Sequence, residues 1–278
     1  MTDLEALEQA AATIERALGP MDVWVNCAGN GTYGRFLDTP AEEFRRVTDV
    51  TYLGTVNGTR AALRRMLPRD RGRIVNVCSA VAFRGVPLLS SYTGAKHAVR
   101  GFGQSICAEL AEDGSQVRLT TIFPPAVNTP FFDHAPSYMG HAGRPMAPVY
   151  QPEVVAQAIH LAAIGGGREM PVSFTSVLFA IAARLAPSLV DRAIGRLGYD
   201  GQAAATDAPS ATTLFEPSRD ASPARGAFGK GARSWSVHVA ILSAFAWLTG
   251  KVHRVPSIAE DRPLDQRLRS GVNLTDQG

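Results

Sequence analysis

The chain has 278 residues, of which 45% are hydrophobic and 19% are charged. This length and composition suit a soluble globular protein with one large domain, with or without an appendage. The net charge of +3 is small, and no dense run of basic residues with interleaved aromatics is present, so a nucleic-acid-binding function has little support.

The three cysteines, Cys27, Cys78 and Cys107, form no CxxC pair and number too few for a disulfide framework or a zinc site. We therefore expect reduced thiols in a cytoplasmic protein, and no bound metal. The first 18 residues are acidic and helical in pattern, without the basic start and apolar run of a secretion signal. The apolar stretch from Trp235 to Leu248 is shorter than the about 20 residues that cross a bilayer.

The predicted elements alternate between helix and strand. A helix over residues 3–18 ends at Gly19, and an apolar strand over 22–29 follows. A long helix over 41–66 is expected to begin with Thr39 as its cap and Pro40 in its first turn. The remaining elements are a strand over 73–79, a helix over 90–112, a strand over 117–123, a helix over 152–164, a strand over 168–174, and an apolar helical stretch over 175–198 that is interrupted at Pro187.

This alternation predicts an α/β fold, with a parallel sheet covered by helices on both faces. Ligands of such sheets bind beyond the carboxyl ends of the strands. We expect one domain over residues 1–175 and an apolar helical extension over 176–199. A composition rich in Ala, Gly, Pro, Ser and Thr predicts a flexible linker over 200–234, followed by a short apolar helix and a polar tail over 235–278.

The strongest chemical signal is the pair Tyr92 and Lys96, which a spacing of four places on one face of a helix. A nearby cation favours the ionised form of a phenol, which can then exchange a proton with a carbonyl or alcohol oxygen. The lysine can also bond the ribose hydroxyls of a cofactor. Taken alone, the pair could instead be an exposed helical pair, which is the less favoured interpretation.

Three further motifs fall at predicted strand ends. Ser79 ends the second strand, where its hydroxyl can hold a substrate oxygen against Tyr92 or merely cap the next turn. The segment from Asn26 to Gly29 ends the first strand with a glycine that permits close approach of backbone or cofactor. After the third strand, Pro124 and Pro125 force a rigid exit, and Thr129 offers a hydroxyl to a carboxamide or to a turn.

Together, these four ordered motifs resemble the classical short-chain dehydrogenase/reductase family over about residues 1–175. The resemblance implies a Rossmann-like doubly wound sheet and hydride transfer between NAD or NADP and a carbonyl or alcohol. It implies that Tyr92 is the acid/base, that Lys96 supplies the positive charge and holds the ribose, and that Ser79 positions the substrate. The implied cofactor-binding residues are Asn26, Ala28, Gly29, Tyr92, Lys96, Pro124, Val127 and Thr129.

Two departures from the family pattern limit these expectations. Thr51 stands where the family often has a catalytic asparagine, and its short hydroxyl cannot copy the reach of an amide, so we leave it out of the catalytic set. No Thr-Gly-x3-Gly-x-Gly turn, which holds the cofactor pyrophosphate in the family, occurs before Gly29. The resemblance then implies that the first three strands are absent and that the strand at Val23 to Ala28 is an exposed edge.

This second departure leaves two interpretations open. A start assigned downstream of the true one is favoured because the catalytic motifs are intact, and a degraded, non-catalytic binding protein is the alternative. Either way, we expect the chain as written to bind dinucleotide poorly. The choice between NAD and NADP cannot be predicted, because the residues that decide it follow the family's second strand.

Two apolar regions remain. The loop over 130–150 carries several aromatic and methionine side chains at the place of the family's substrate lid, which suggests an apolar substrate or packing onto the core. The segment from Trp235 to Leu248 has basic flanks, and we expect it to dock on its own protein or on a partner subunit in a homo-oligomer, with membrane-surface contact as an alternative.

Overall fold

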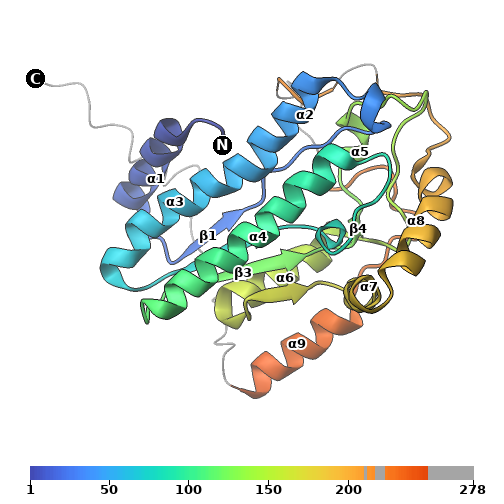
Figure 1. The fold of residues 1–278 in the computed structure, drawn as a ribbon. Helices are drawn as coiled ribbons and strands as arrows, with labels where there is room; N and C mark the ends of the chain where they lie inside the picture. The colour runs from blue at the N-terminus through green and yellow to red at the C-terminus, as the bar shows by residue number, and fades with distance from the viewer. Residues whose placement is uncertain (210–211, 217–222, 250–278) are drawn as a thin grey trace, which may run out of the picture.

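The computed structural model describes residues 1–209, 212–216 and 223–249. At its centre is a parallel four-stranded sheet in the order β1-β2-β3-β6 (Figure 1). The strands are β1 (Val23–Asn26), β2 (Arg73–Val77), β3 (Arg118–Phe123) and β6 (Glu169–Pro171).

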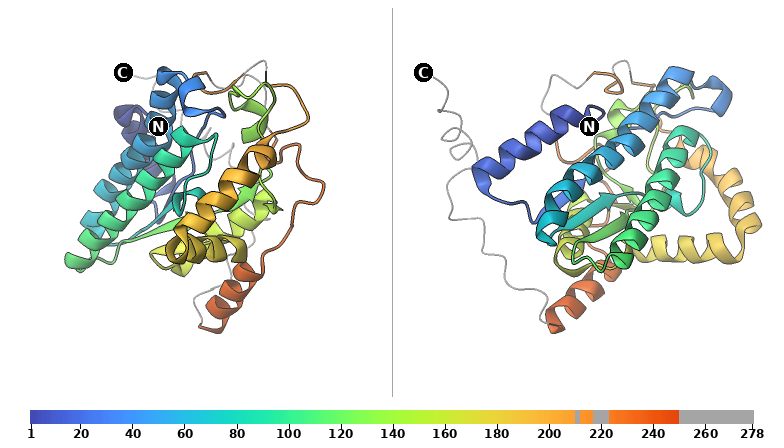
Figure 2. Two further views of the ribbon diagram at one scale, coloured as in Figure 1. Left: turned by 45° about the vertical axis from the view of Figure 1, so that its right-hand side comes forward. Right: turned by 60° about the vertical axis from the view of Figure 1, so that its left-hand side comes forward.

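Helices cover both faces of this sheet, which confirms the predicted α/β fold (Figure 2). On one face α3 (Gly54–Met66) and α4 (Ser90–Glu112) pack against Ile74 and Leu119, and α1 (Leu4–Leu18) lies beside α3. On the other face, α6 (Pro152–Gly165) packs against Val75 and Ile122, and α9 (Val237–Leu248) packs on α6. Neighbouring strand residues thus point to opposite faces, and both sides of the sheet are buried along β2 and β3.

The strand register brings three chain segments together at the carboxyl end of the sheet. Asn26 pairs with Asn76, and Asn76 pairs with Thr121, so the first three strands in sheet order end at nearly the same level. The segments that follow them, 27–31, 78–80 and 124–129, therefore meet at the carboxyl end of the sheet. This is the region where ligands of such folds bind.

The first strand is an exposed edge, as predicted. Within the described residues β1 pairs with β2 alone. Val23 and Val25 are 42% and 40% exposed, which is high for alternate residues of an apolar strand in a parallel sheet. The outer backbone edge of β1 is consequently open to pairing.

The predicted helix over 41–66 is observed with these bounds, but it contains a π-helical turn at its centre and lacks the predicted cap at its start. The structure has α2 (Ala41–Thr48), a π-helical turn η2 (Asp49–Leu53), and then α3. Thr39 makes no cap, because its hydroxyl donates to the Arg35 carbonyl, and Pro40 precedes the first helical residue. A π turn adds a residue to the helix and shifts the faces of α2 and α3 relative to each other.

The second half of the chain adds shorter elements, and the predicted break at Pro187 is confirmed. Two short strands, β4 (Ala126–Val127) and β5 (Val149–Tyr150), pair beside the main sheet, with α5 (Phe131–His134) between them in sequence. Helices α7 (Phe174–Leu185) and α8 (Pro187–Gln202) follow β6. The remaining short turns are η1 (Phe36–Asp38), η3 (Leu67–Arg69) and η4 (Ala80–Ala82).

The predicted flexible linker over 200–234 differs from what the structure shows for its described parts. Leu214 is only 2% exposed, and its carbonyl accepts a 2.9 Å bond from Arg46 Nε. Arg233 exchanges backbone bonds with the strand β5 region, through Val149 and Gln151. These contacts bind the segment to the domain, although its composition is typical of an unpacked chain. The tail beyond residue 249 lies outside the described residues.

Candidate active site

Lys96 lies at the centre of the carboxyl end of the sheet. Its side chain is 3% exposed, and Nζ donates a 2.8 Å hydrogen bond to the carbonyl of Val77, the last residue of β2. Nζ also lies 5.5 Å from the ring centroid of Tyr92, one turn earlier on α4. The spacing in sequence thus places cation and phenol on one helix face, and strand β2 fixes the cation.

The exit of β1 passes directly beside this lysine. A Cβ atom placed on Gly29 would lie 3.5 Å from Lys96 Nζ and 3.7 Å from Thr51 Oγ1. Two residues later, a Cβ on Gly31 would lie 3.3 Å from Tyr92 Cβ. Any larger side chain at these glycines would therefore take up space around the lysine and the tyrosine.

Ser79 occupies the predicted place at the end of β2, but its hydroxyl is a local cap. Ser79 Oγ accepts a 3.4 Å bond from the backbone N–H of Val81, which is the capping role that its sequence position also allowed. The backbone around it is held by β3, since Ala80 N–H donates to the Pro124 carbonyl. Among the described side-chain bonds, none joins Ser79 to Tyr92.

Asn26 is a brace within the sheet, and its amide is fully used. Its Nδ2 donates to Thr59 Oγ1 and to Asn76 Oδ1, and its Oδ1 accepts from Trp24 Nε1 at 2.8 Å. The side chain is 2% exposed, so it joins β1 to β2 and α3 instead of facing a ligand. Ala28, half-buried, lies between this brace and Gly29.

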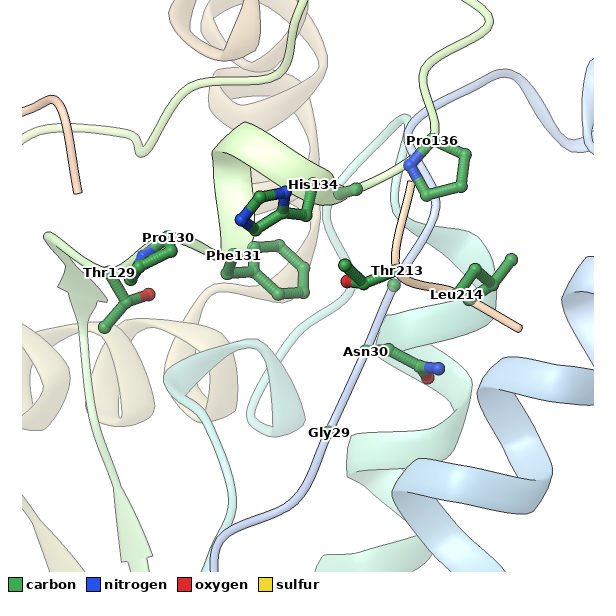
Figure 3. A pocket seen from close by; sticks show the side chains of 11 residues that line it. Gly29, Asn30, Thr129, Pro130, Phe131, His134, Pro136, Thr213 and Leu214 are labelled. Atoms are coloured by element: carbon green, nitrogen blue, oxygen red, sulfur yellow. The ribbon is translucent and has the colours of Figure 1, made fainter. Parts of the chain in front are cut away.

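A pocket of about 250 Å³ lies where the strand exits meet (Figure 3). Two of the eight predicted cofactor residues, Gly29 and Thr129, line it, whereas the other six, Tyr92 and Lys96 among them, do not. Pro124 is buried behind the Ser79 turn, and Val127 pairs with Tyr150 in the small sheet. The remaining lining comes from Asn30, Gly31, Pro130, Phe131, His134, Ala135, Pro136, Thr213 and Leu214.

Thr51 was left out of the predicted site, and the structure places it inside. It is fully buried in the π turn, where its hydroxyl accepts from Asn30 N–H and lies 3.1 Å from the Asn30 carbonyl oxygen. Turns of this kind are frequent at functional sites. The Thr51 hydroxyl does not take the place of the amide of the family's asparagine. It holds the loop that follows Gly29 in position. No glycine or proline lies within the turn. The one sequence signal for Thr51 was therefore its alignment with the position of the family's catalytic asparagine.

Tyr33 and the segment around Leu214 were also missed. Tyr33 is 1% exposed and packs edge-on against Phe131 with 6.4 Å between ring centroids. Burial raises the pKa of Tyr33 well above its usual range, and the neighbouring Tyr92 adds to this effect. Tyr33 therefore stays uncharged at neutral pH. Glycines on both sides of it, Gly31 and Gly34, were the available sequence signal.

The charges around the pocket are few. Burial raises the pKa of the Cys78 thiol to about 11, so Cys78 is neutral at physiological pH and is no nucleophile. None of the salt bridges among the described residues involves Lys96, so its ammonium is free of a carboxylate partner there. In the same part of the chain, no group of His, Cys, Asp and Glu side chains is arranged to hold a metal ion.

Comparison with known proteins identifies the family. The sequence pattern of the short chain dehydrogenases matches residues 1–138. The uncharacterized oxidoreductase YxnA of Bacillus subtilis is 34% identical over 200 residues, which cover 71% of this chain and 56% of YxnA. The probable oxidoreductase EphD of Mycobacterium tuberculosis is 44% identical over 130 residues, covering 46% of this chain and 22% of EphD. The chain thus spans about half, or less, of the length of these relatives.

The fold comparison agrees. The crystal structure of a short chain dehydrogenase from Mycobacterium paratuberculosis bound to NAD aligns with a TM-score of 0.53 at 27% identity, covering 61% of this chain and 69% of that chain. The matched residues 1–138 include the Tyr92–Lys96 pair on α4 and the first three strands of the parallel sheet. Through this part, the chain belongs to the short-chain dehydrogenase/reductase family.

Proposed function

We propose that the chain carries the proton-exchange half of an oxidoreductase site for a carbonyl or alcohol substrate. Tyr92 gives a proton to the substrate oxygen during reduction and takes one during oxidation. Lys96 supplies the positive charge beside the phenol, and Ser79 would turn its hydroxyl from Val81 toward the substrate oxygen.

The observation that carries this proposal is the placement of the Lys96 ammonium. It is 3% exposed and lies 5.5 Å from the Tyr92 ring. A buried charge without a carboxylate is costly, and proteins retain such charges mainly where they serve a site. A purely structural role would be served as well by an apolar side chain, because Lys96 makes a single hydrogen bond, to the Val77 carbonyl.

Lys96 and the pocket residues Gly29 and Thr129 fit a nicotinamide dinucleotide. An ammonium has three donors, and one of them is used by Val77, so two remain for ribose hydroxyls. Gly29 leaves the space beside Nζ free of side chain, and Thr129 lines the pocket with its hydroxyl. The bound nicotinamide would supply or accept the hydride. A similarity to a dehydrogenase bound to NAD supports this assignment, and the choice between NAD and NADP stays open.

The lid over 130–150 supports an apolar substrate. Phe131 lines the pocket and lies 5.7 Å, centroid to centroid, from the Tyr92 ring. Phe132 and Met139 instead pack onto Tyr33 in the core, so only part of this aromatic loop faces the pocket.

A second candidate is a binding protein without turnover, and the open edge of β1 favours it. In the family the pyrophosphate end of the cofactor would lie beyond this edge. No further strand pairs with β1 in the described residues. The chain as written would then hold the nicotinamide end of a dinucleotide weakly.

One experiment distinguishes the two. Fluorescence titrations with NADH and NADPH measure binding, and their consumption with cyclohexanone, acetophenone and decanal measures turnover. The oxidoreductase proposal predicts turnover that falls by about 100-fold or more in Tyr92→Phe, because one acid/base group contributes that much. Binding should change little in the same variant. Turnover equal in Tyr92→Phe and the parent chain would refute the role of Tyr92, and weak binding without turnover would favour the second candidate.

A further inference from the structure

Helix α9 has apolar side chains on both of its faces. Its inner face, with Val239, Leu242 and Ala246, packs on the core around α6, as expected for docking on its own protein. Its outer face carries Val237, Ile241, Phe245 and Leu248, which are between 51% and 74% exposed. No charged residue occurs between residues 237 and 248. A solvent-facing helix surface normally carries charged or polar groups.

Helix α7 presents a second stripe of the same kind. Phe174, Leu178, Ile181 and Leu185 follow one another at spacings of four, three and four residues, which places them on one helix face, and all are 49% exposed or more. The two helices begin side by side, because Ser236 Oγ donates a 2.9 Å bond to the Val172 carbonyl. Figures 1 and 2 show α7 and α9 leaving this common point in different directions.

Positive charge is concentrated in the segments that build this surface. Residues 174–202 and 223–249 contain six basic and two acidic side chains, a net charge of +4, whereas the whole chain carries +3. One of the acids, Asp191, is already paired with Arg84 from another part of the fold. The basic side chains are Arg184 on α7, Arg192 and Arg196 on α8, and Arg225, Lys230 and Arg233 in the segment before α9; of these, Arg225 is paired with Glu153.

Two tryptophans flank the outer face of α9. Trp235 precedes the helix and Trp247 lies in its last turn, and both are mostly exposed. Indole rings favour the boundary between water and lipid. A helix of 12 residues is about 18 Å long, well short of the about 30 Å of a bilayer core. Among the residues that the structure describes, no helix combines the length and apolar character needed to cross a membrane.

We propose that the outer faces of α7 and α9 form a surface that binds peripherally to membranes rich in anionic lipids. The apolar stripes would enter the headgroup boundary, and the basic side chains would attract the negative lipid surface. A stripe of exposed apolar side chains on a helix often marks an interaction site, and each of these two helices carries one. The basic excess favours anionic lipid over a second copy of the chain, which would bring the same positive charge.

The test uses the full chain and its sedimentation with two kinds of vesicle, phosphatidylcholine alone and phosphatidylcholine mixed with phosphatidylglycerol. The chain should bind the mixed vesicles and bind the neutral ones more weakly. Raising the salt concentration should weaken binding to the mixed vesicles, because salt screens exposed charges. Two double variants, Ile241→Glu with Phe245→Glu and Leu178→Glu with Leu185→Glu, should each bind about tenfold or more weakly.

The control variant is Leu37→Glu, at a residue of η1 that is 89% exposed but lies outside both helices. The Leu37→Glu variant should bind vesicles like the parent chain. Because all the substituted side chains are exposed, every variant should fold, and thermal melting checks this. Absence of binding, or equal binding by all variants, would overturn the proposal. A dimer in light scattering that the helix variants dissociate, without vesicle binding, would assign this surface to contact between copies.

Discussion

The hydroxyl of Thr51 holds both backbone groups of a single residue, Asn30. Oγ1 accepts from the Asn30 N–H at 3.1 Å and lies 3.1 Å from the Asn30 carbonyl oxygen, to which it donates. Thr51 is fully buried, so water does not compete for either bond. This clamp fixes the chain just after Gly29, beside the Lys96 ammonium. A side chain in a π turn of one helix therefore shapes the floor of the pocket.

Replacing Thr51 with Val should destabilise the protein by about 1 kcal/mol, because the N–H and carbonyl of the half-buried Asn30 lose their partner. Thr51→Ser keeps the hydroxyl and should recover most of the loss. Urea denaturation measures both variants. If Thr51→Val unfolds at the same urea concentration as the parent, the clamp contributes nothing to stability. In a chain with turnover, Thr51→Val should raise KM for the dinucleotide more than it lowers kcat.

Leu214 should behave as a core residue despite the composition around it. Its side chain packs against Val47 and Ala95, and Leu214→Ala should cost about 2–4 kcal/mol of unfolding free energy, the range for a buried leucine. Phe215→Ala is the matched control, since Phe215 is its neighbour but is mostly exposed, and its effect should be within about 0.5 kcal/mol. Equal effects of the two substitutions in denaturant melts would mean that this segment is not packed in solution.

Gly58 on α3 is required by the Asn26 brace. A Cβ atom there would lie 2.0 Å from Asn26 Oδ1, so the buried amide would have to move. Gly58→Ala should destabilise the protein by about 1–3 kcal/mol, as overpacking does. Gly101→Ala on α4, where a Cβ meets nothing within 4 Å, should instead stabilise it by up to about 1 kcal/mol. Thermal melts of the two variants should therefore shift in opposite directions, and a shift in the same direction would contradict the packing argument.

The carboxylate of Glu169 on β6 should make the stability of the protein depend on pH in the acidic range. Burial alone would raise its pKa, but hydrogen bonds from Arg100 and Gln104 outweigh burial and lower it. A carboxyl whose pKa is lower in the folded state stabilises the fold above its unfolded pKa of about 4.3, and this contribution is lost as the pH falls through the folded value. Glu169→Gln should thus be less stable than the parent at pH 7, by about 1 kcal/mol or less for a partly exposed ion pair.

The measurement for Glu169 is urea denaturation at several pH values. The difference between parent and Glu169→Gln should shrink as the pH falls below about 4. Gln104→Ala removes one of the donors and should show a smaller difference in the same pH range. A gap between parent and Glu169→Gln that is independent of pH would show that packing, and not the carboxylate charge, sets the difference.

Much of the fold could be predicted because its determinants are local. The helix over 90–112 is observed with these bounds, and the spacing of Tyr92 and Lys96 placed both on one face of it. The first three strands are short apolar runs, a signal that depends on a few adjacent residues, and Pro124 marks the end of β3. The sheet order then follows from parallel strands joined by crossover helices.

The rest depends on contacts between distant residues, which no local pattern records. The side-chain amide of Asn26 donates both of its hydrogen bonds to Thr59 and Asn76. Asn26, which was predicted to bind the cofactor, therefore joins elements of the fold instead. The hydroxyl of Ser79 caps its own turn, a choice that its sequence position left open. The π turn at 49–53 has no glycine or proline, and within it Thr51 bonds to Asn30 after β1, a contact that adjacent residues do not reveal.

The bond between Arg46 and Leu214 joins residues that are 168 positions apart. A contact of such range closes late, because the loop entropy must be lost before the contact forms. On a ribosome, the strands and the Tyr92–Lys96 pair would emerge well before the segment that finishes the pocket wall. A nascent chain would therefore carry the acid–base pair before it carries the segment that closes the cavity on the side of Leu214.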